Sequence, residues 1–187
     1  MEKVEKLKNG MILYHASYKI IKNVDLSCCR EGLDFGKGFY LTTSKEQAKR
    51  FVKNSVGRAI LNKKIKKQKY GYINVFHYTD DEEIKEKIFL DANSEWLHFV
   101  VKNRDVNIKI KTDDTKYDVI GGKIANDFTA RTISIYISGG YGDVGSKEAD
   151  EMAIKILLPN KLKDQYCFLT KKSLKNLLYV ESIKYEF

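Results

Sequence analysis

The stretch that decides the fold is Phe35-Gly36-Lys37-Gly38-Phe39-Tyr40-Leu41-Thr42-Thr43. Gly36 and Gly38 permit a positive φ angle or a close approach of two backbones just before a strand begins. The strand around Tyr40 leads into Ser44-Lys45-Glu46-Gln47, which has the serine and glutamine spacing of a capping box. The stretch therefore predicts a glycine-relieved turn, a short strand, and a helix from residue 44 to about residue 61.

A second apolar strand, predicted over residues 11–15, lies upstream and runs into His15-Ala16-Ser17. Phe51 falls about two turns into the predicted helix, so its ring and that of Tyr40 could face one another across a flat ligand. The spacing of Phe51 with the apolar helix residues around it also fits an ordinary core position. The pattern alone leaves both interpretations open.

These residues resemble the nicotinamide-site motifs of the ADP-ribosyltransferase superfamily, in the branch that includes diphtheria toxin and the poly(ADP-ribose) polymerases. The matching features are His15 with Ser17, Gly-Lys-Gly-Phe-Tyr at 36–40, and Ser-Lys followed by an aromatic residue at 51. The chain looks closest to a bacterial family of that superfamily catalogued as a domain of unknown function. The resemblance covers residues 11 to 187 and implies an α+β fold of two split sheets with short helices.

The resemblance implies an NAD-dependent mono-ADP-ribosyltransferase, which moves ADP-ribose from NAD to a protein or nucleic-acid acceptor and releases nicotinamide. His15 and Ser17 would bind ribose groups, and Tyr40 would stack on nicotinamide with Phe51 opposite. The implied catalytic residues are His15, Tyr40 and Gln165. NAD is the implied co-substrate, and the residues implied to bind it are His15, Ala16, Ser17, Gly38, Tyr40 and Phe51.

Gln165 is a departure from the family pattern, because it stands where the family has a glutamate that opens a late strand. An amide keeps a hydrogen bond to the ribose but carries no charge, and losing the charge would cost about 2–4 kcal/mol of transition-state stabilisation. We therefore expect a slow enzyme that does not elongate polymers, or else an inactive module that binds NAD or ADP-ribose. Glu148 and Glu151 are either substitute carboxylates or, with Lys147 and Asp150, part of a solvated helix face.

The net charge of +9 raises a further alternative, a basic protein that binds nucleic acid. The densest basic cluster is the run Lys63, Lys64, Lys66, Lys67 and Lys69. This run is either a solvated turn or a contact surface for an RNA or DNA acceptor. The sequence has no helix-turn-helix, RNA-recognition or zinc-finger signature, which argues against a reader of base sequence.

Composition and length favour one domain over residues 1–187, with residues 1–10 as an N-terminal extension. No apolar run is long enough to cross a bilayer and no signal peptide opens the chain, so we expect a cytoplasmic protein with no membrane partner. The three cysteines, two of them adjacent, are expected to be reduced, and no cluster with metal-ligand spacing is present. His77 and His98 are interpreted as structural.

The remaining pattern predicts alternating strands and helices. Strands are expected at 72–78, 117–122, 165–169 and 179–186, and helices at 94–103 and 171–178. A further helix should begin at Ser146, end at Pro159, and turn Ala149, Met152, Ala153, Ile156 and Leu157 inward. Residues 133–138 alternate like a strand, but the resemblance favours a helix there.

Overall fold

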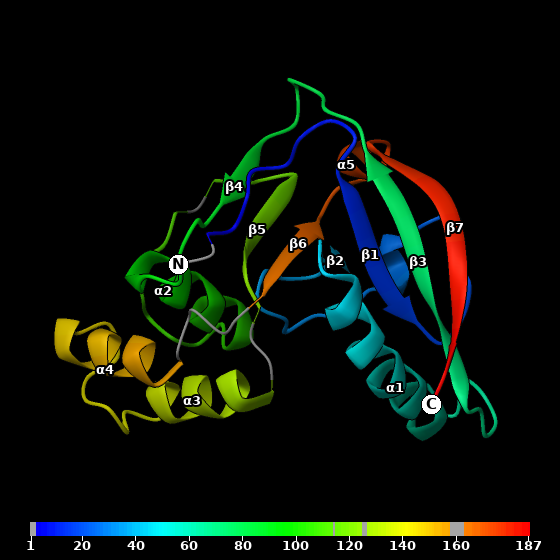
Figure 1. Ribbon diagram of the computed structural model, residues 1–187. Coiled ribbons are helices and arrows are strands. Elements are labelled where there is room, and N and C mark those ends of the chain that lie inside the picture. Colours follow the sequence, from blue (N-terminus) through cyan, green and yellow to red (C-terminus); the bar gives the residue numbers. More distant parts are fainter. Residues whose placement is uncertain (1–2, 114, 125–126, 158–162) are drawn as a thin grey trace.

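The computed structural model describes residues 3–113, 115–124, 127–157 and 163–187 and shows an α+β protein with two sheets and short helices. Figure 1 shows the sheets side by side, with one long helix against the first and a group of three helices beside the second. The prediction of an α+β chain with two sheets is confirmed.

The first sheet has the order β1-β3-β7 and is antiparallel throughout. Its strands are β1 (Ile12–Ser17), β3 (Tyr70–Tyr78) and β7 (Leu177–Glu186). Helix α1 (Lys45–Leu61) covers one face, where Ala48, Val52 and Val56 pack with Tyr14, Ala16 and Ile73. These helix residues recur at spacing four, which places them on one face of the helix.

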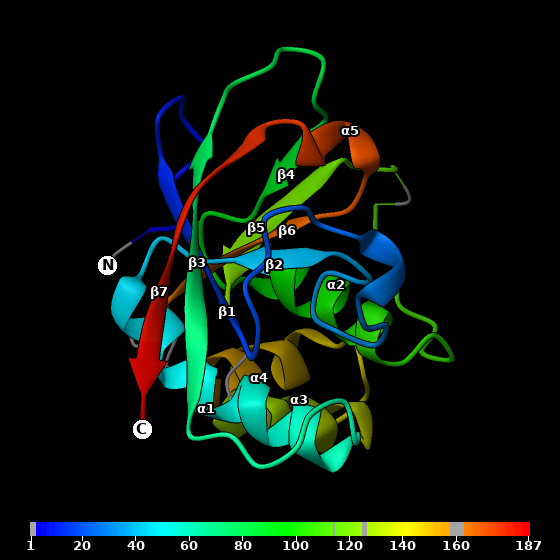
Figure 2. The same cartoon turned by 90° about the vertical axis from the view of Figure 1, so that its right-hand side faces the viewer.

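The second sheet has the order β2-β6-β5-β4. Its strands are β2 (Phe39–Leu41), β6 (Asp164–Phe168), β5 (Val119–Lys123) and β4 (Glu86–Ile88). The pairs are antiparallel except for β4 with β5, which is parallel. In Figure 2 the strands of the first sheet run vertically, and β2, β5 and β6 run across them.

The two sheets touch where β1 meets the end of β2. Tyr14 and Thr42 exchange both backbone hydrogen bonds, at 2.8 and 3.0 Å, as an isolated antiparallel bridge. Beside this bridge an apolar cluster fills the space between the sheets and includes Leu13, Phe39, Phe76 and Phe168. The bridge and this cluster fix β1 and β2 relative to each other.

Helices cover the other face of the second sheet. They are α2 (Ser94–Arg104), α3 (Asp127–Ile137) and α4 (Lys147–Leu157), and their core includes Trp96, Val100, Tyr136 and Ala153 together with Ile120 and Cys167 of the sheet. A 3-10 turn, η1 (Leu26–Cys28), lies before β2, and the single-turn helix α5 (Lys171–Leu174) lies between β6 and β7.

Most predicted elements are present with shifted ends. Ser44 caps α1 by accepting a hydrogen bond from the Gln47 backbone nitrogen at 3.2 Å, and residues 133–137 are helical as part of α3. The Gln47 side chain does not complete the capping box, because its Nε2 donates to the Asp164 carbonyl oxygen at 3.3 Å. This tertiary contact outweighs the local one.

Three helix predictions need correction. The helix expected over 171–178 is one turn long, because β7 begins at Leu177 and pairs with β3. On α4, Met152 is 49% exposed rather than inward, whereas Asp150, expected on the solvated face, is 4% exposed. Asp150 accepts hydrogen bonds from His98 Nε2, at 2.7 Å, and from the Tyr136 hydroxyl, so its partners explain its burial. The expected helix stop at Pro159 lies outside the described residues.

The segment before β1, expected to be an extension, packs on the core. Val4 and Leu7 are buried between the sheets, and the Tyr166 hydroxyl donates to the Glu5 carbonyl oxygen at 2.7 Å. No helix within the described ranges combines the length and the apolar character needed to cross a membrane. Cys28, Cys29 and Cys167 are free thiols, as expected.

Candidate functional site

The first two predicted motifs meet through His15 and Tyr40. His15 lies on β1, and its Nδ1 is 2.7 Å from the backbone carbonyl oxygen of Tyr40 on β2. A carbonyl oxygen only accepts, so Nδ1 carries the proton and donates. The His15 ring also packs on Phe39, with ring centroids 4.3 Å apart. These contacts hold the imidazole at the junction of the two sheets.

The second nitrogen of His15 is open. Nε2 has no hydrogen-bond partner among the described residues, and no buried side-chain nitrogen or oxygen in those residues lacks one, so Nε2 reaches solvent. Burial lowers the pKa of His15 from 6.5 to about 4, against the smaller raising effect of its bond to Tyr40. At neutral pH the imidazole is therefore neutral, and Nε2 can accept a hydrogen bond from a ligand hydroxyl.

Tyr40 uses its hydroxyl to hold the preceding loop. The hydroxyl donates to the Gly36 carbonyl oxygen at 2.8 Å and accepts from the Phe35 backbone nitrogen at 2.9 Å. Burial raises the pKa of Tyr40, so the hydroxyl stays protonated. The loop turns at Gly36, whose φ is +86° and is the positive value that the sequence allowed.

Gly38 serves the other role that the sequence allowed, a close approach. A Cβ at this position would lie 2.4 Å from Cys167 Sγ and 2.7 Å from the Phe168 carbonyl oxygen. Glycine thus lets the loop lie directly on β6. Because Tyr40 pairs with Cys167, the approach also sets the register of β2 against β6.

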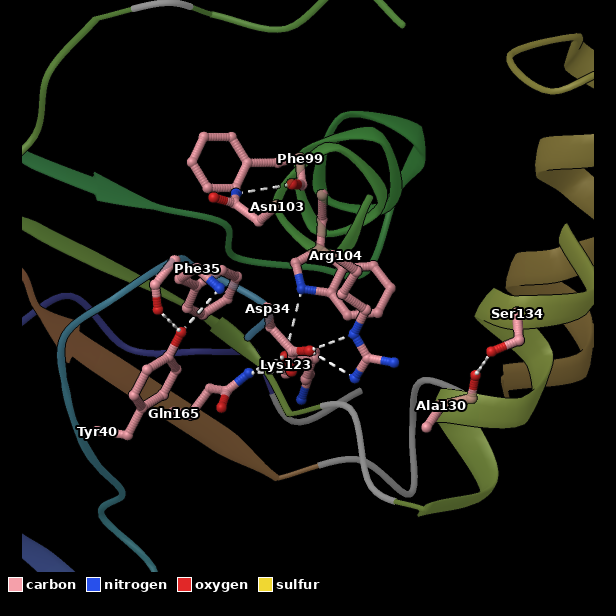
Figure 3. A network of polar contacts seen from close by, with 12 residues as sticks. Asp34, Phe35, Tyr40, Phe99, Asn103, Arg104, Lys123, Ala130, Ser134 and Gln165 are labelled. Carbon is pink, nitrogen blue, oxygen red and sulfur yellow. Dashed lines mark hydrogen bonds and ion pairs between the residues drawn. The ribbon is translucent and has the colours of Figure 1, made fainter. Parts of the chain in front are cut away.

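Gln165 lies on the same face of the second sheet as Tyr40. Tyr40 is paired with Cys167, and Gln165 is two residues before Cys167 on β6, so the three share a face. The Gln165 side chain is buried, with 5% of the residue exposed. Its Nε2 donates to Asp34 Oδ2 at 2.8 Å and to the Lys123 carbonyl oxygen at 3.3 Å (Figure 3). The structure therefore brings the predicted positions 15, 40 and 165 to adjoining strands.

The other predicted NAD-binding positions are less clearly placed for a ligand. Ser17 is buried, and its Oγ accepts from the Lys19 backbone nitrogen at 3.3 Å. The Ala16 side chain packs in the cluster beneath α1, on the opposite face of β1 from His15. Phe51 lies partly exposed on α1, and no direct ring contact with Tyr40 is present among the described residues.

Residues 11–179 match the family described as "Protein of unknown function (DUF3990)". The chain belongs to this family. No curated protein and no solved structure matches the chain. The family description assigns no activity to this DUF3990 chain.

Sequence reasoning missed an ion pair beside Gln165. Asp34, 6% exposed, accepts at Oδ1 from Arg104 Nε at 2.8 Å, and Arg104 Nη2 lies 2.6 Å from the same oxygen. Asp34 directly precedes the Phe35-Gly36 turn, which was the available signal. Arg104, at the end of α2, is seventy positions away, and no local pattern connects the two.

Asp164 is a second missed residue, next to Gln165 on β6. Its carboxylate accepts from the Thr42 hydroxyl at 2.8 Å, from the Thr43 backbone nitrogen at 2.9 Å, and from the Thr43 hydroxyl. These bonds fasten the turn between β2 and α1. Asp164 therefore fixes the position of Tyr40 relative to the helix that carries Phe51.

The other acidic candidates lie apart from this cluster. Glu148 and Glu151 are exposed on α4, and Glu151 lies 3.9 Å from Lys147, which agrees with a solvated face. His98 bonds Asp150, and His77 is exposed. Two cavities of about 370 and 400 Å³ lie beside α2 and α5 and are lined by none of the predicted site residues. Within the part of the chain that the structure describes, no three His, Cys, Asp or Glu residues form a metal-binding group.

Proposed function

We propose that this chain is an NAD-dependent mono-ADP-ribosyltransferase with a split two-sheet ADP-ribosyltransferase fold. The observation that carries the proposal is the placement of His15, Tyr40 and Gln165 on adjoining strands, although Tyr40 and Gln165 are 125 positions apart in the sequence. These are the positions that the motif resemblance singles out. None of the motifs alone requires the three residues to lie on adjoining strands, so their placement there supports the resemblance.

In the proposed reaction the C–N bond between nicotinamide and ribose breaks, and its electron pair leaves with nicotinamide. A nucleophile of the acceptor bonds to the ribose carbon and loses its proton. The transition state has oxocarbenium character, so the site must orient the ribose and favour positive charge on it. Nothing in this step requires a redox partner.

The chain's own groups fit a ribose and a nicotinamide ring. His15 Nε2 is a neutral acceptor open to solvent, suited to a ribose hydroxyl. Tyr40, whose backbone carbonyl oxygen binds His15, contributes an aromatic ring held by the two loop bonds of its hydroxyl. Gln165 contributes a hydrogen bond without a charge, so we propose slow transfer of single ADP-ribose units to a protein or nucleic-acid acceptor.

A second candidate function is an NAD or ADP-ribose binding module without catalysis. The observation that favours it is the amide at position 165, which cannot supply the electrostatic stabilisation of a carboxylate at the reacting carbon. The basic nucleic-acid-binding protein is a third candidate, supported by the exposed lysines at 63, 64, 66, 67 and 69. The site residues favour the transferase over this third candidate.

Incubation of the purified chain with NAD labelled on nicotinamide tests the proposal. We expect slow release of labelled nicotinamide, reduced at least about 10-fold in His15→Ala, because the variant loses the ribose acceptor. His77→Ala is the matched control, since His77 is an exposed histidine on a strand of the same sheet, and it should release nicotinamide at the wild-type rate.

The outcomes separate the candidates. NAD binding without nicotinamide release identifies the binding module. If the chain neither binds NAD nor releases nicotinamide, both NAD-based functions are rejected. Equal loss in the His15 and His77 variants would point to unfolding and not to a ligand contact, so thermal midpoints of both variants are measured beside the assay.

A further inference from the structure

The amide of Gln165 has only one orientation that satisfies its neighbours. Nε2 faces two groups that only accept, the Asp34 carboxylate at 2.8 Å and the Lys123 carbonyl oxygen at 3.3 Å. Turning the amide over would place its oxygen against both acceptors. Nε2 is therefore fixed toward Asp34 and Lys123, and Oε1 is the amide atom that these neighbours do not bind.

Oε1 of Gln165 is available to a ligand. It has no hydrogen-bond partner among the described residues, and no buried side-chain oxygen in those residues lacks a partner, so Oε1 reaches solvent. This is the same condition as that of His15 Nε2. Both free atoms are acceptors, and a ribose presents hydroxyl donors.

We propose that Asp34 is a positioning residue of this site, which turns the Gln165 amide so that Oε1 accepts a hydrogen bond from a ribose hydroxyl of NAD. This inference rests on the proposed function. Asp34 acts through Gln165. The bond from Nε2 to a carboxylate also polarises the amide and makes Oε1 a stronger acceptor.

Asp34 is itself held on two sides. Arg104 places Nε and Nη2 within 2.8 and 2.6 Å of Oδ1, and Gln165 Nε2 donates to Oδ2 (Figure 3). The next residue, Phe35, donates its backbone N–H to the Tyr40 hydroxyl. Tyr40 therefore holds the backbone beside Asp34, and Asp34 holds Gln165, so two of the proposed site residues are linked through Asp34.

The pairing accounts for a glutamine where the resemblance leads one to expect a glutamate. A glutamate at this position would face the Asp34 carboxylate and the Lys123 carbonyl oxygen without a proton to share. Two carboxylates this close cannot both ionise, so one pKa would rise strongly. Asp34 and Gln165 are thus a matched acceptor and donor, and exchanging one of them alone breaks the match.

An exchange of the two side-chain types tests this inference, using Asp34→Asn, Gln165→Glu and the double variant. In Asp34→Asn, the oxygen of the introduced amide stays with Arg104 and its nitrogen faces Gln165, so the Gln165 amide turns over and presents Nε2 outward. We expect kcat/KM for nicotinamide release to fall about 10-fold or more. The kcat/KM of Gln165→Glu should fall by a similar factor, and its pH profile should show an ionisation that the wild type lacks.

The double variant restores the donor and acceptor pairing between positions 34 and 165, since the amide introduced at position 34 donates to the carboxylate introduced at position 165, although the Lys123 carbonyl oxygen loses the donor that Gln165 supplies. The double variant also leaves a carboxylate oxygen facing the ribose, so its kcat/KM should recover well above that of either single variant. Asp150→Asn is the matched control, because Asp150 is as buried as Asp34 (4% against 6% exposed) and lies outside the site. The control should keep wild-type kcat/KM in its folded fraction.

The inference is overturned if Asp34→Asn releases nicotinamide at the wild-type rate, or if the double variant is inactive or unfolded. Either result leaves the proposed function standing. If Asp34→Asn alone does not fold, the double variant still decides, because it restores the hydrogen bond between positions 34 and 165. If the wild-type chain binds NAD without cleaving it, the same three variants are compared by their affinity for NAD. A wild-type chain that neither binds nor cleaves NAD rejects the proposed function, and with it this inference.

Discussion

His15 Nδ1 lies 2.7 Å from the backbone carbonyl oxygen of Tyr40, and this single bond joins a side chain of one sheet to the backbone of the other. Because the acceptor is a carbonyl, the imidazole is fixed in one tautomer, with Nε2 unprotonated. Both the ligand chemistry proposed for His15 and the pH dependence of folding follow from this bond and from the burial around it.

The lowered pKa of His15 predicts acid sensitivity. The unfolded chain takes up the proton near pH 6.5 and the folded chain only near pH 4, so the free energy of unfolding falls as pH drops through this window, by at most about 3 kcal/mol. His15→Asn keeps a donor for the Tyr40 carbonyl but does not titrate. Denaturant unfolding from pH 7 to pH 4 should show a flatter dependence for this variant. Parallel curves would contradict the prediction.

Tyr40→Phe should destabilise the chain by about 1–3 kcal/mol, because it removes the hydroxyl that bonds Phe35 and Gly36 and leaves a backbone N–H without its partner. Tyr14→Phe is the control, since the Tyr14 hydroxyl has no hydrogen bond among the described residues, and it should change stability by less than about 0.5 kcal/mol. Urea midpoints measure both. Tyr40→Ala also removes the packed ring, so it cannot separate ligand binding from folding.

Gly38→Ala should destabilise by about 2 kcal/mol or more, because the new methyl group meets Cys167 Sγ and the Phe168 backbone and forces β2 away from β6. Gly57→Ala, on α1, has no heavy atom within 4 Å of the new Cβ and should instead stabilise by about 0.5–1 kcal/mol through helix propensity. Thermal or urea unfolding compares the two alanines. Similar losses in both variants would show that the contact at Gly38 is not what requires glycine.

The lysine run gives a prediction about salt. If nucleic acid is the acceptor, changing Lys63, Lys64, Lys66 and Lys67 to Gln should lower the slope of log affinity against log salt by the equivalent of at most about four phosphate contacts. The control carries Gln at four other exposed lysines: Lys22, Lys53, Lys155 and Lys171. Fluorescence anisotropy with a labelled single strand measures both slopes. Equal slopes in the two variants would indicate that the lysine run is an ordinary solvated turn.

The sequence predicted what is local in this fold and missed what depends on distant partners. The two uses of glycine at 36 and 38 and the Ser44 cap follow from neighbouring residues. The contact between Asp34 and Gln165 spans 131 positions, and Arg104 joins it from a third segment. No periodicity records such a contact. The same limit applies to the burial of Asp150, because its partners His98 and Tyr136 come from two other helices.

The strand order has a consequence for the growing chain on the ribosome. Among the described strands β2 pairs with β6 alone in its sheet, and β3 lies between β1 and β7, so each sheet contains an early strand and either β6 or β7. The 123 positions from Leu41 to Asp164 take on the order of ten seconds to synthesise. During that interval the nascent chain carries His15 and Tyr40 without the strand that bears Gln165. A nascent chain therefore lacks the assembled site until the ribosome has translated β6.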